Sequence, residues 1–417
     1  MEKRPSRKLK LYRRSRRGNI LGVAINLALR ATTLYLLILS QGSRCQLECR
    51  LLGLASITKP SPDLARKYGY PVEVHNLLTE DGYNVQLHRI PHGRSGIRSS
   101  KKGPILLQHG LAGSSADWIL MGPDRGLGYF LADEGYDVWL GNNRGNIYSK
   151  NASVLPTDRY YWNYSYHELG VYDLPAVIDY ILSETGTESL FYIGHSQGST
   201  QFFVMASEKP DYNSKIRLMI GLAPAAYTGN LRGSWVGENF GYPQFRARSA
   251  WGKFIGSIFC QNAVPTQFIC NSLLFLLAGL SDSQLNTYLP VIIGHVPAGG
   301  SWKQFVHYGQ GYLFPSTTNR FRKFNYFDNN KNQIAYGQSE PPDYELENIK
   351  TPIAVFSSEN DWLATPRDVE LLVERLDSLV FHRKITTTTF NHYDFIWGNS
   401  AVEEVFEPIL QLLEQYR

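Results

Sequence analysis

The sequence predicts an open, mostly parallel α/β sheet flanked by helices, with a large insertion near its last strands. Three observations predict it. Short apolar runs are continuous rather than alternating, which is typical of strands buried on both faces. Helix-like segments alternate with these runs, as in α/β folds. The alternation stops between about Ala226 and Leu346 and resumes at Pro352, where an inserted segment is expected.

The predicted strands are four to six residues long and rich in Val, Ile, Leu, Phe and Tyr. They are Pro104–Gln108, Tyr136–Leu140, Leu190–Ile193, Leu218–Leu222 and Pro352–Phe356. The clearest predicted helices are Asp173–Leu182, Gln201–Ser207 and Ala401–Gln415. The last of these carries its apolar residues at the spacing of one helix face.

The insertion is expected to form a cap over the carboxyl ends of the strands, where open α/β sheets bind ligands. It contains Cys260, Cys270 and an apolar run, Leu273–Leu280. The predicted division of the chain is a tail and leader over 1–44, a core over 45–225, a cap over 226–346 and the rest of the core over 347–417.

The net charge of +5 misrepresents the folded part of the chain. Residues 1–17 alone carry +8, Arg30 and Arg44 add two more charges, and residues 45–417 are therefore at −5. A nucleic-acid partner would need a basic face on the body of the protein, and the charge distribution offers none. We expect no nucleic-acid partner.

A basic tail, an apolar stretch from Ile20 to Leu39 and small residues at Ser40, Gly42 and Ser43 follow the order of a secretory signal. We expect a cleaved signal. The alternative is an uncleaved membrane anchor through residues 20–39, which are long enough to span a bilayer but contain Arg30.

Two further features agree with an oxidising secretory compartment. The chain has four cysteines, and their spacing does not resemble a zinc ribbon. Glycosylation sequons begin at Asn151 and Asn163.

The strongest motif is Gly194-His-Ser196-Gln-Gly198, which follows an apolar strand and precedes a helical stretch. This context matches the strand–turn–helix nucleophile elbow of α/β-hydrolases, in which glycines leave room around a strained serine. The fold expected is therefore the α/β-hydrolase fold with an inserted cap or lid subdomain, and Ser196 is the expected nucleophile.

A serine nucleophile needs a base and an acid, which in this fold follow it along the chain in the order acid, then histidine. His295 and His307 precede Pro352, and His382 lies inside a β-like run, which leaves His392 as the expected base. The acid should follow the strand Pro352–Phe356.

The possible acids there are Glu359, Asp361 and Asp368. Asp368 follows Pro366 where a helix should begin, so a role in the first helical turn is the simpler interpretation. Asp361 is preferred. The expected oxyanion donors are the amides of Gln197, after the nucleophile, and Leu111, after the predicted strand Pro104–Gln108. The triad chemistry needs neither a metal nor an organic cofactor.

Taken together, these motifs resemble the animal acid lipases, the family of gastric and lysosomal acid lipase. The resemblance extends from about Tyr68 to the C-terminus. Besides the serine motif it includes His109-Gly-Leu111, Asn143-Arg-Gly145, Asp361-Trp-Leu-Ala364 and Asn391-His-Tyr-Asp-Phe395.

The resemblance implies the triad Ser196, Asp361 and His392, the oxyanion donors Leu111 and Gln197, a disulfide between Cys260 and Cys270, and a lid within the cap. Three features depart from the family pattern: the long basic tail, Thr365 where family members commonly have Asp, and Cys45 and Cys49, which have no assigned family role.

The function expected is a secreted lipase that hydrolyses triacylglycerols or sterol esters at an oil–water or membrane surface. A lysosomal or membrane-anchored enzyme is the alternative for its location. A soluble carboxylesterase of small esters is the alternative activity, and a non-catalytic lipid-binding relative is the third hypothesis. The presence of all three expected triad residues argues against the last of these. The sequence does not predict an oligomeric state.

Overall fold

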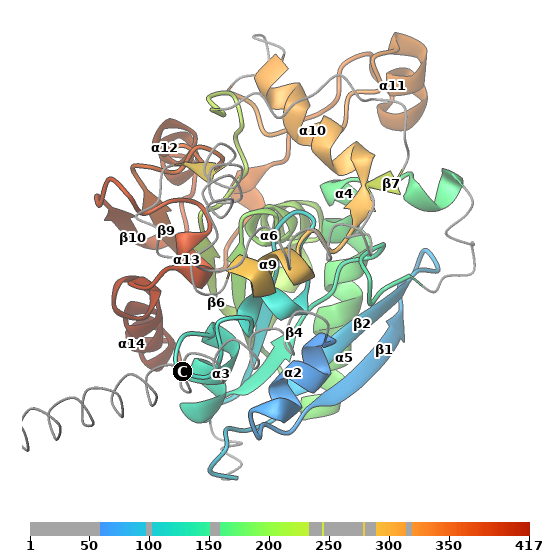
Figure 1. Cartoon of the computed structure of the whole chain (residues 1–417). Coiled ribbons are helices and arrows are strands. Elements are labelled where there is room, and N and C mark those ends of the chain that lie inside the picture. The colour runs from blue at the N-terminus through green and yellow to red at the C-terminus, as the bar shows by residue number, and fades with distance from the viewer. Residues whose placement is uncertain are drawn as a thin grey trace, which may run out of the picture. The chain divides into compact units, whose positions relative to one another are not determined.

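The structure, a computed structural model, describes residues 59–96, 102–150, 159–232, 244–245, 278–279, 289–313 and 319–417. All of them belong to one unit that spans Ser56–Arg417. Within these residues, an eight-stranded sheet has the order β1-β2-β4-β3-β5-β6-β9-β10 (Figure 1). Its strands are β1 Glu73–Leu78, β2 Asn84–Ile90, β3 Pro104–Gln108, β4 Asp137–Leu140, β5 Leu190–His195, β6 Ile216–Leu222, β9 Ile353–Ser358 and β10 Leu379–Ile385.

The sheet is parallel from β4 to β10, and only β1 and β2 run antiparallel to their neighbours. The prediction of a mostly parallel sheet is therefore confirmed. The central strands β3, β5, β6 and β9 are almost completely buried, which explains their continuous apolar runs. In contrast, β1 alternates between half-buried and exposed residues, so its sequence has no continuous apolar run that would predict a buried strand.

Helices flank the sheet, as expected. The helices in the described residues are α2 Ser61–Lys67, α3 Leu127–Asp133, α4 Tyr166–Glu168, α5 Leu174–Thr185, α6 Gln197–Glu208, α9 Leu289–His295, α10 Trp302–Leu313, α11 Asn329–Tyr336, α12 Pro366–Val373, α13 Asp394–Trp397 and α14 Glu407–Gln415. Helix α3 packs against the helical turn Val402–Phe406 that leads into α14, where the rings of Phe130 and Phe406 are 5.8 Å apart. No helix among these residues is long and apolar enough to cross a membrane.

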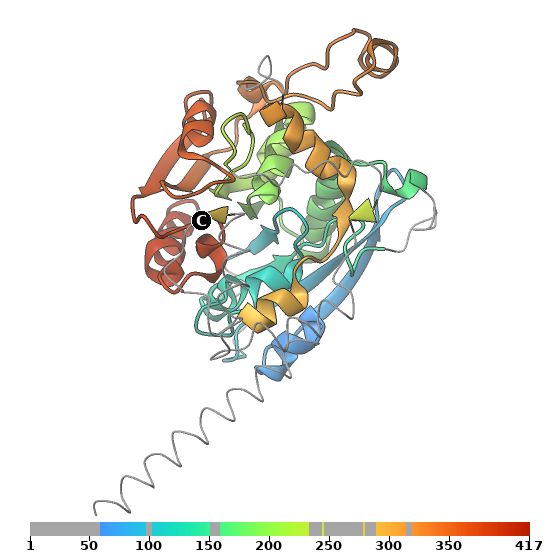
Figure 2. The same ribbon diagram turned by 45° about the horizontal axis from the view of Figure 1, so that its top comes forward.

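The segment between β6 and β9 contributes α9, α10, α11 and a short two-stranded pairing of β7 (Gln244–Phe245) with β8 (Gly300–Ser301). Figure 2 shows α10 beside α6, the helix that follows β5. This segment occupies the position at which the cap is predicted. Its exact limits remain a prediction, and Cys260, Cys270 and most of Leu273–Leu280 lie outside the described residues.

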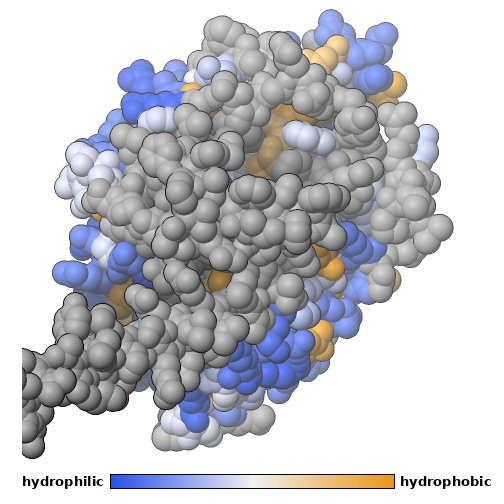
Figure 3. All heavy atoms as spheres, viewed as in Figure 1, coloured by the Kyte–Doolittle hydropathy of each residue, from blue (hydrophilic) through white to orange (hydrophobic). Residues whose placement is uncertain are grey.

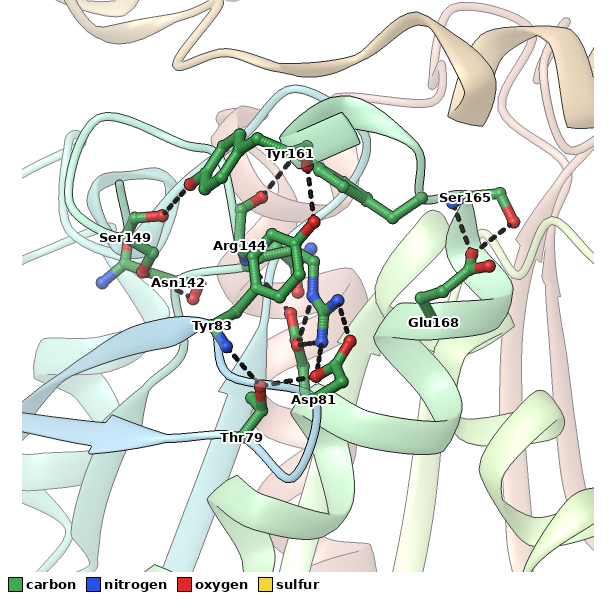
Figure 4. A network of polar contacts seen from close by, with 12 residues as sticks. Thr79, Asp81, Tyr83, Asn142, Arg144, Ser149, Tyr161, Ser165 and Glu168 are labelled. Atoms are coloured by element: carbon green, nitrogen blue, oxygen red, sulfur yellow. Dashed lines mark hydrogen bonds and ion pairs between the residues drawn. The ribbon is translucent and has the colours of Figure 1, made fainter. Parts of the chain in front are cut away.

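A buried ion-pair network holds the loop after β4 (Figure 4). Arg144 is only 1% exposed and bonds both to Asp81, at 2.6 and 2.8 Å, and to Asp173, at 2.7 Å. The ring of Tyr83 lies 3.9 Å from its guanidinium carbon, in a cation–π contact. Burial raises the pKa of Asp173, whereas the positive charge of Arg144 acts to lower it. The buried carboxylate of Asp173 is therefore stabilised by its charged partner.

We expect Arg144→Met to destabilise the protein strongly, because it leaves Asp173 buried and without its charged partner. Breaking a buried pair in this way costs about 3–5 kcal/mol. Arg66→Met is the matched control, since Arg66 pairs with Asp63 at the surface and both side chains are about half exposed. Urea unfolding of both variants measures the difference, and equal stabilities would show that the network is not important for folding.

Candidate active site

Ser196 lies at the turn between β5 and α6, in a backbone conformation with φ 53° and ψ −115°. A side-chain-bearing residue rarely adopts such angles, so the turn is strained. Its amide donates to the carbonyl of Leu222 at 2.8 Å, which ties the turn to β6. A Cβ at Gly194 would lie 2.6 Å from the backbone of Gly198, and one at Gly198 would lie 2.2 Å from the carbonyl oxygen of Gln108. Both positions therefore require glycine.

The expected acid and base lie in contact at the same edge of the sheet. The Nδ1 atom of His392 is 2.8 Å from Oδ2 of Asp361, and both side chains are buried. The other oxygen of Asp361 accepts from the amides of Leu363 and Ala364, both at 2.8 Å. An ionised carboxylate only accepts hydrogen bonds, so Nδ1 of His392 carries the proton and Nε2 is left able to act as a base.

The other candidate acids, Glu359 and Asp368, and the other candidate histidine, His382, form hydrogen bonds or ion pairs with residues other than the expected triad. Glu359 is near Lys384, at 3.6 Å, on the surface. Asp368 accepts from Asn230 and from the hydroxyl of Thr365 in the first turn of α12. His382 lies 2.9 Å from the hydroxyl of Ser357.

The loop after β3 supplies Gly110 and Leu111, and a four-residue turn closes it with a hydrogen bond from the amide of Gly113 to the carbonyl of Gly110. A Cβ at Gly110 would lie 3.2 Å from Cβ of Ser196, so this loop is next to the nucleophile. His109 is buried beneath it and donates from Nδ1 to the carbonyl of Gly110, while Nε2 accepts from the amide of Asn143. Burial lowers the pKa of His109 to about 4.

His195, which precedes the nucleophile, connects it to the base. Its Nε2 lies 2.9 Å from the carbonyl oxygen of His392. A carbonyl only accepts, so Nε2 of His195 is the donor. Burial and, to a smaller extent, the proximity of His392 lower the pKa of this imidazole to about 3. The sequence analysis did not identify His195 as a site residue, because its partner lies 197 positions away in the chain.

A cavity of about 280 Å³ adjoins these residues. Its walls include Ser196, His392 and Leu111, and most of its other lining is apolar: Leu231, Ile292, Ile293, Val296, Pro297, Phe305, Ile396 and Trp397. On the face shown in Figure 3, some hydrophobic residues are visible in the upper half, whereas the described residues at the edges are mostly hydrophilic. The cavity therefore suits an apolar ligand with a reactive group near Ser196.

Helix α10 binds the start of α6 through polar side chains. Gln304 donates to the side chain of Gln197 at 3.0 Å, and Tyr308 donates to the hydroxyl of Thr200 at 2.8 Å. Gln197 is the first residue of α6, whose amino end carries a partial positive charge. This end of the helix favours negative charge near the amide of Gln197, the expected oxyanion donor.

Asp117 is an unexpected polar residue in the cavity wall. It is 5% exposed and one carboxyl oxygen accepts from the amide of Ser114 at 3.3 Å. The other oxygen has no hydrogen-bond partner among the described residues. Burial raises the pKa of this carboxyl to about 7. In the sequence, Ser114-x-x-Asp117 indicates only an ordinary helix cap, so nothing marked it as part of the site.

The remaining predicted residues are only partly described. Asn163 is exposed, with its side-chain oxygen accepting from Lys303 at 3.1 Å. Asn151, Cys260 and Cys270 lie outside the described residues. Where side chains are described, no group of three or more His, Cys, Asp or Glu is arranged to hold a metal ion.

Comparison with known proteins gives matches over most of the chain. Residues 61–122 match the family model of a partial alpha/beta-hydrolase lipase region, and residues 103–253 match that of the alpha/beta hydrolase fold. Lipase 3 of Drosophila melanogaster is 38% identical over 387 residues, which cover 88% of this chain and 97% of the relative.

Two mammalian relatives are similar at 37% identity. Gastric triacylglycerol lipase of Rattus norvegicus aligns with 84% of this chain and 90% of its own. Lysosomal acid lipase/cholesteryl ester hydrolase of Homo sapiens aligns with 84% and 89%. A solved structure from Sulfolobus solfataricus, only 15% identical, has a TM-score of 0.56 over 83% of this chain and 94% of its own, which supports the fold.

We expect His195→Phe to lower the reactivity of Ser196 about tenfold or more, because it removes the donor that holds the carbonyl of His392. His195→Gln is the matched variant, since its amide can still donate, and it should retain most of the reactivity. The measurement is the rate at which a fluorophosphonate reagent labels Ser196, followed against pH, with thermal unfolding in parallel. Equal labelling rates in the two variants would contradict a positioning role for His195.

The raised pKa of Asp117 predicts a pH-dependent stability. Its pKa is higher in the folded than in the unfolded chain, so the folded protein binds a proton more tightly and loses stability as the pH rises from about 4 to about 7. The melting temperature of Asp117→Asn, which stays neutral, should exceed that of the wild type by more at pH 8 than at pH 5. A difference in melting temperature that is the same at both pH values would contradict this assignment.

Proposed function

Because the chain belongs to the lipase family of α/β-hydrolases that includes gastric and lysosomal acid lipase, we propose that it hydrolyses the carboxylic ester bonds of neutral lipids, triacylglycerols and sterol esters, at a lipid surface. The observation that carries the proposal is that Ser196 and His392 both line an apolar cavity, with Asp361 hydrogen-bonded to His392 behind it.

The proposed mechanism uses Ser196 as nucleophile. His392 takes the proton of the hydroxyl as Ser196 attacks the ester carbonyl, and Asp361 holds the imidazole and stabilises its charged form. The amides of Leu111 and Gln197 donate to the oxyanion of the tetrahedral intermediate. His392 then protonates the leaving alcohol, an acyl-enzyme forms, and water activated by the same histidine hydrolyses it.

The apolar cavity wall favours a lipase over a soluble carboxylesterase of small esters. An ester with a short acyl chain would leave much of this surface unfilled, whereas a long acyl chain gains about 25 cal/mol for each Å² of apolar surface that it buries. The third hypothesis, a non-catalytic lipid-binding protein, has no comparable support, because the strained turn at Ser196 costs stability without serving lipid binding.

The location of the protein is a separate proposal. We propose that residues 1–44 direct the chain into the secretory pathway, with secretion as the main outcome and a lysosomal or membrane-anchored enzyme as the alternatives. The relatives named gastric and lysosomal lipases support this assignment. A disulfide between Cys260 and Cys270 and glycans on Asn151 and Asn163 would accompany it.

We expect Ser196→Ala to abolish hydrolysis of emulsified triacylglycerol, sterol ester and a short soluble ester, and His392→Gln and Asp361→Asn to lower the rate on all three by at least about a thousandfold. Glu359→Gln is the matched control for the acid and should leave each rate unchanged, since Glu359 lies at the surface. A Ser196→Ala protein as active as the wild type would refute an enzyme of this mechanism. Activity confined to the short ester would favour the carboxylesterase.

For the location, N-terminal sequencing of the protein from an expressing animal cell should begin after the apolar stretch, and glycosidase treatment should lower its apparent mass. An intact Met1 in a membrane fraction would favour the anchor, and an intact Met1 in unglycosylated, soluble protein would contradict the secretory assignment.

A further inference from the structure

Two buried residues of the segment between β6 and β9, Ala278 and Gly279, lie against the loop that carries the expected acid. The amide of Trp362 donates to the carbonyl of Ala278 at 3.3 Å. A Cβ at Gly279 would lie 2.2 Å from the carbonyl oxygen of Asn360. Asn360 and Trp362 are the two neighbours of Asp361 in the chain, so this pair of residues contacts the acid loop on both sides of Asp361.

The same glycine is hydrogen-bonded to the loop that carries the expected base. The side-chain amide of Asn391, which precedes His392, donates to the carbonyl of Gly279 at 3.1 Å. The side-chain oxygen of Asn391 accepts from the amide of Tyr393 at 2.9 Å. A backbone amide only donates, which identifies the oxygen on the Tyr393 side and the NH2 group on the Gly279 side. Asn391 is 1% exposed, so both bonds are shielded from water.

Asn391 therefore holds His392 in two ways. Its bond to Tyr393 closes a turn around the backbone of His392, since these two residues flank the histidine. Its bond to Gly279 ties that turn to the residue that packs against the acid loop. The 2.8 Å contact between His392 and Asp361 joins two loops that are 31 positions apart in the chain, and Gly279 contacts both of them.

We propose that Asn391 is a positioning residue for the catalytic pair, which it aligns by fastening the loop of His392, through the carbonyl of Gly279, to the segment that also packs on the loop of Asp361. This inference rests on the proposed function, because it assigns a positioning role in the same triad. The segment between β6 and β9 then contributes to the geometry of the triad as well as to the wall of the cavity, to which α9 and α10 supply residues.

The contact requires the chemistry of an asparagine side chain. It needs a donor towards Gly279 and an acceptor towards Tyr393 on one short side chain. A serine supplies the acceptor, since its oxygen can accept from a nearby backbone amide in a turn, but it is too short to keep the donor in place. An aspartate also lacks the donor and would add a charge beside His392, so Asn391→Ser is the cleaner probe.

The first test measures kcat and KM of the full chain on a short soluble ester, and the rate at which a fluorophosphonate labels Ser196. We expect Asn391→Ser to lower kcat and the labelling rate about tenfold, because misaligned catalytic groups lose rate. KM should change little, since Asn391 is absent from the described lining of the cavity. A merely structural role would lower the melting temperature and leave kcat of the folded variant unchanged.

Gly279→Ala tests the other side of the contact without changing any side chain of the triad. Ordinary carbon–oxygen contacts are about 3.3–3.6 Å, so the new Cβ and the carbonyl of Asn360 must separate by about 1 Å more. We expect kcat to fall about a hundredfold. Gly337→Ala is the matched control: Gly337 also has a positive φ, but a Cβ there would meet nothing within 4 Å. It adds backbone strain without the collision and should leave kcat unchanged.

Proton NMR reports the catalytic pair without any substrate. The proton on Nδ1 of His392 should resonate far downfield, because its partner is a charged carboxylate, and loss of the signal in His392→Gln assigns it. We expect Asn391→Ser and Gly279→Ala to shift or abolish this signal, and Gly337→Ala to leave it in place.

Unchanged kcat, labelling rate and proton signal in both Asn391→Ser and Gly279→Ala would overturn the inference. A fall of kcat in Gly337→Ala as large as in Gly279→Ala would also overturn it, because destabilisation of the segment between β6 and β9 would then explain the loss. Both outcomes leave the lipase proposal intact, provided that Ser196→Ala is inactive. Hydrolysis that persists in Ser196→Ala would instead refute the proposed function.

Discussion

The strained turn at Ser196 is the constraint on which the rest of the site depends. A residue with φ 53° at this position costs stability, and the structure around it holds the turn in place. The amide of Ser196 bonds to β6, Gly194 packs against the start of α6, and Gly198 packs against the end of β3. Three adjacent strands therefore fix one serine. Since these strands are parallel, the loops after β3, β5, β9 and β10 meet at the same edge of the sheet.

Buried hydrogen bonds and an ion-pair network support the loop after β3, which carries the expected oxyanion donor Leu111. Arg144 is anchored by Asp81 and Asp173, and the residue before it, Asn143, donates its amide to His109. His109 in turn donates to the carbonyl of Gly110. A chain of charge-assisted and neutral hydrogen bonds thus connects a buried ion pair to the backbone beside the nucleophile. This connection gives the Asn143-Arg-Gly145 motif a physical role that its sequence alone does not reveal.

Sequence reasoning identified the fold correctly and proposed the triad because each has a local signal in the sequence. Continuous apolar runs mark β3, β5 and β9, and the glycines around Ser196 mark the turn. The residues that it missed depend on contacts across the fold. The role of His195 requires the carbonyl of His392, and the place of Asp117 in the cavity wall requires the loop at Gly113 and a cavity shared with helix α9. Strands β1 and β2 were missed for another reason, since a half-exposed antiparallel pair has no long apolar run.

The electrostatic state of the site follows from burial more than from ion pairing. The ring of His195 lies 4.9 Å from that of His392, which becomes charged during the proposed reaction, and His109 lies beneath the loop that contacts Ser196. A positive charge on either ring would oppose that step. Burial prevents it, because the pKa values of about 4 and about 3 keep both rings neutral even at pH 5. Asp117, with a pKa of about 7, is also neutral at that pH, so it places no negative charge beside the developing oxyanion. Acidification thus removes a competing charge near the nucleophile without adding one on these two histidines, and the buried setting of the site is compatible with catalysis in an acidic medium.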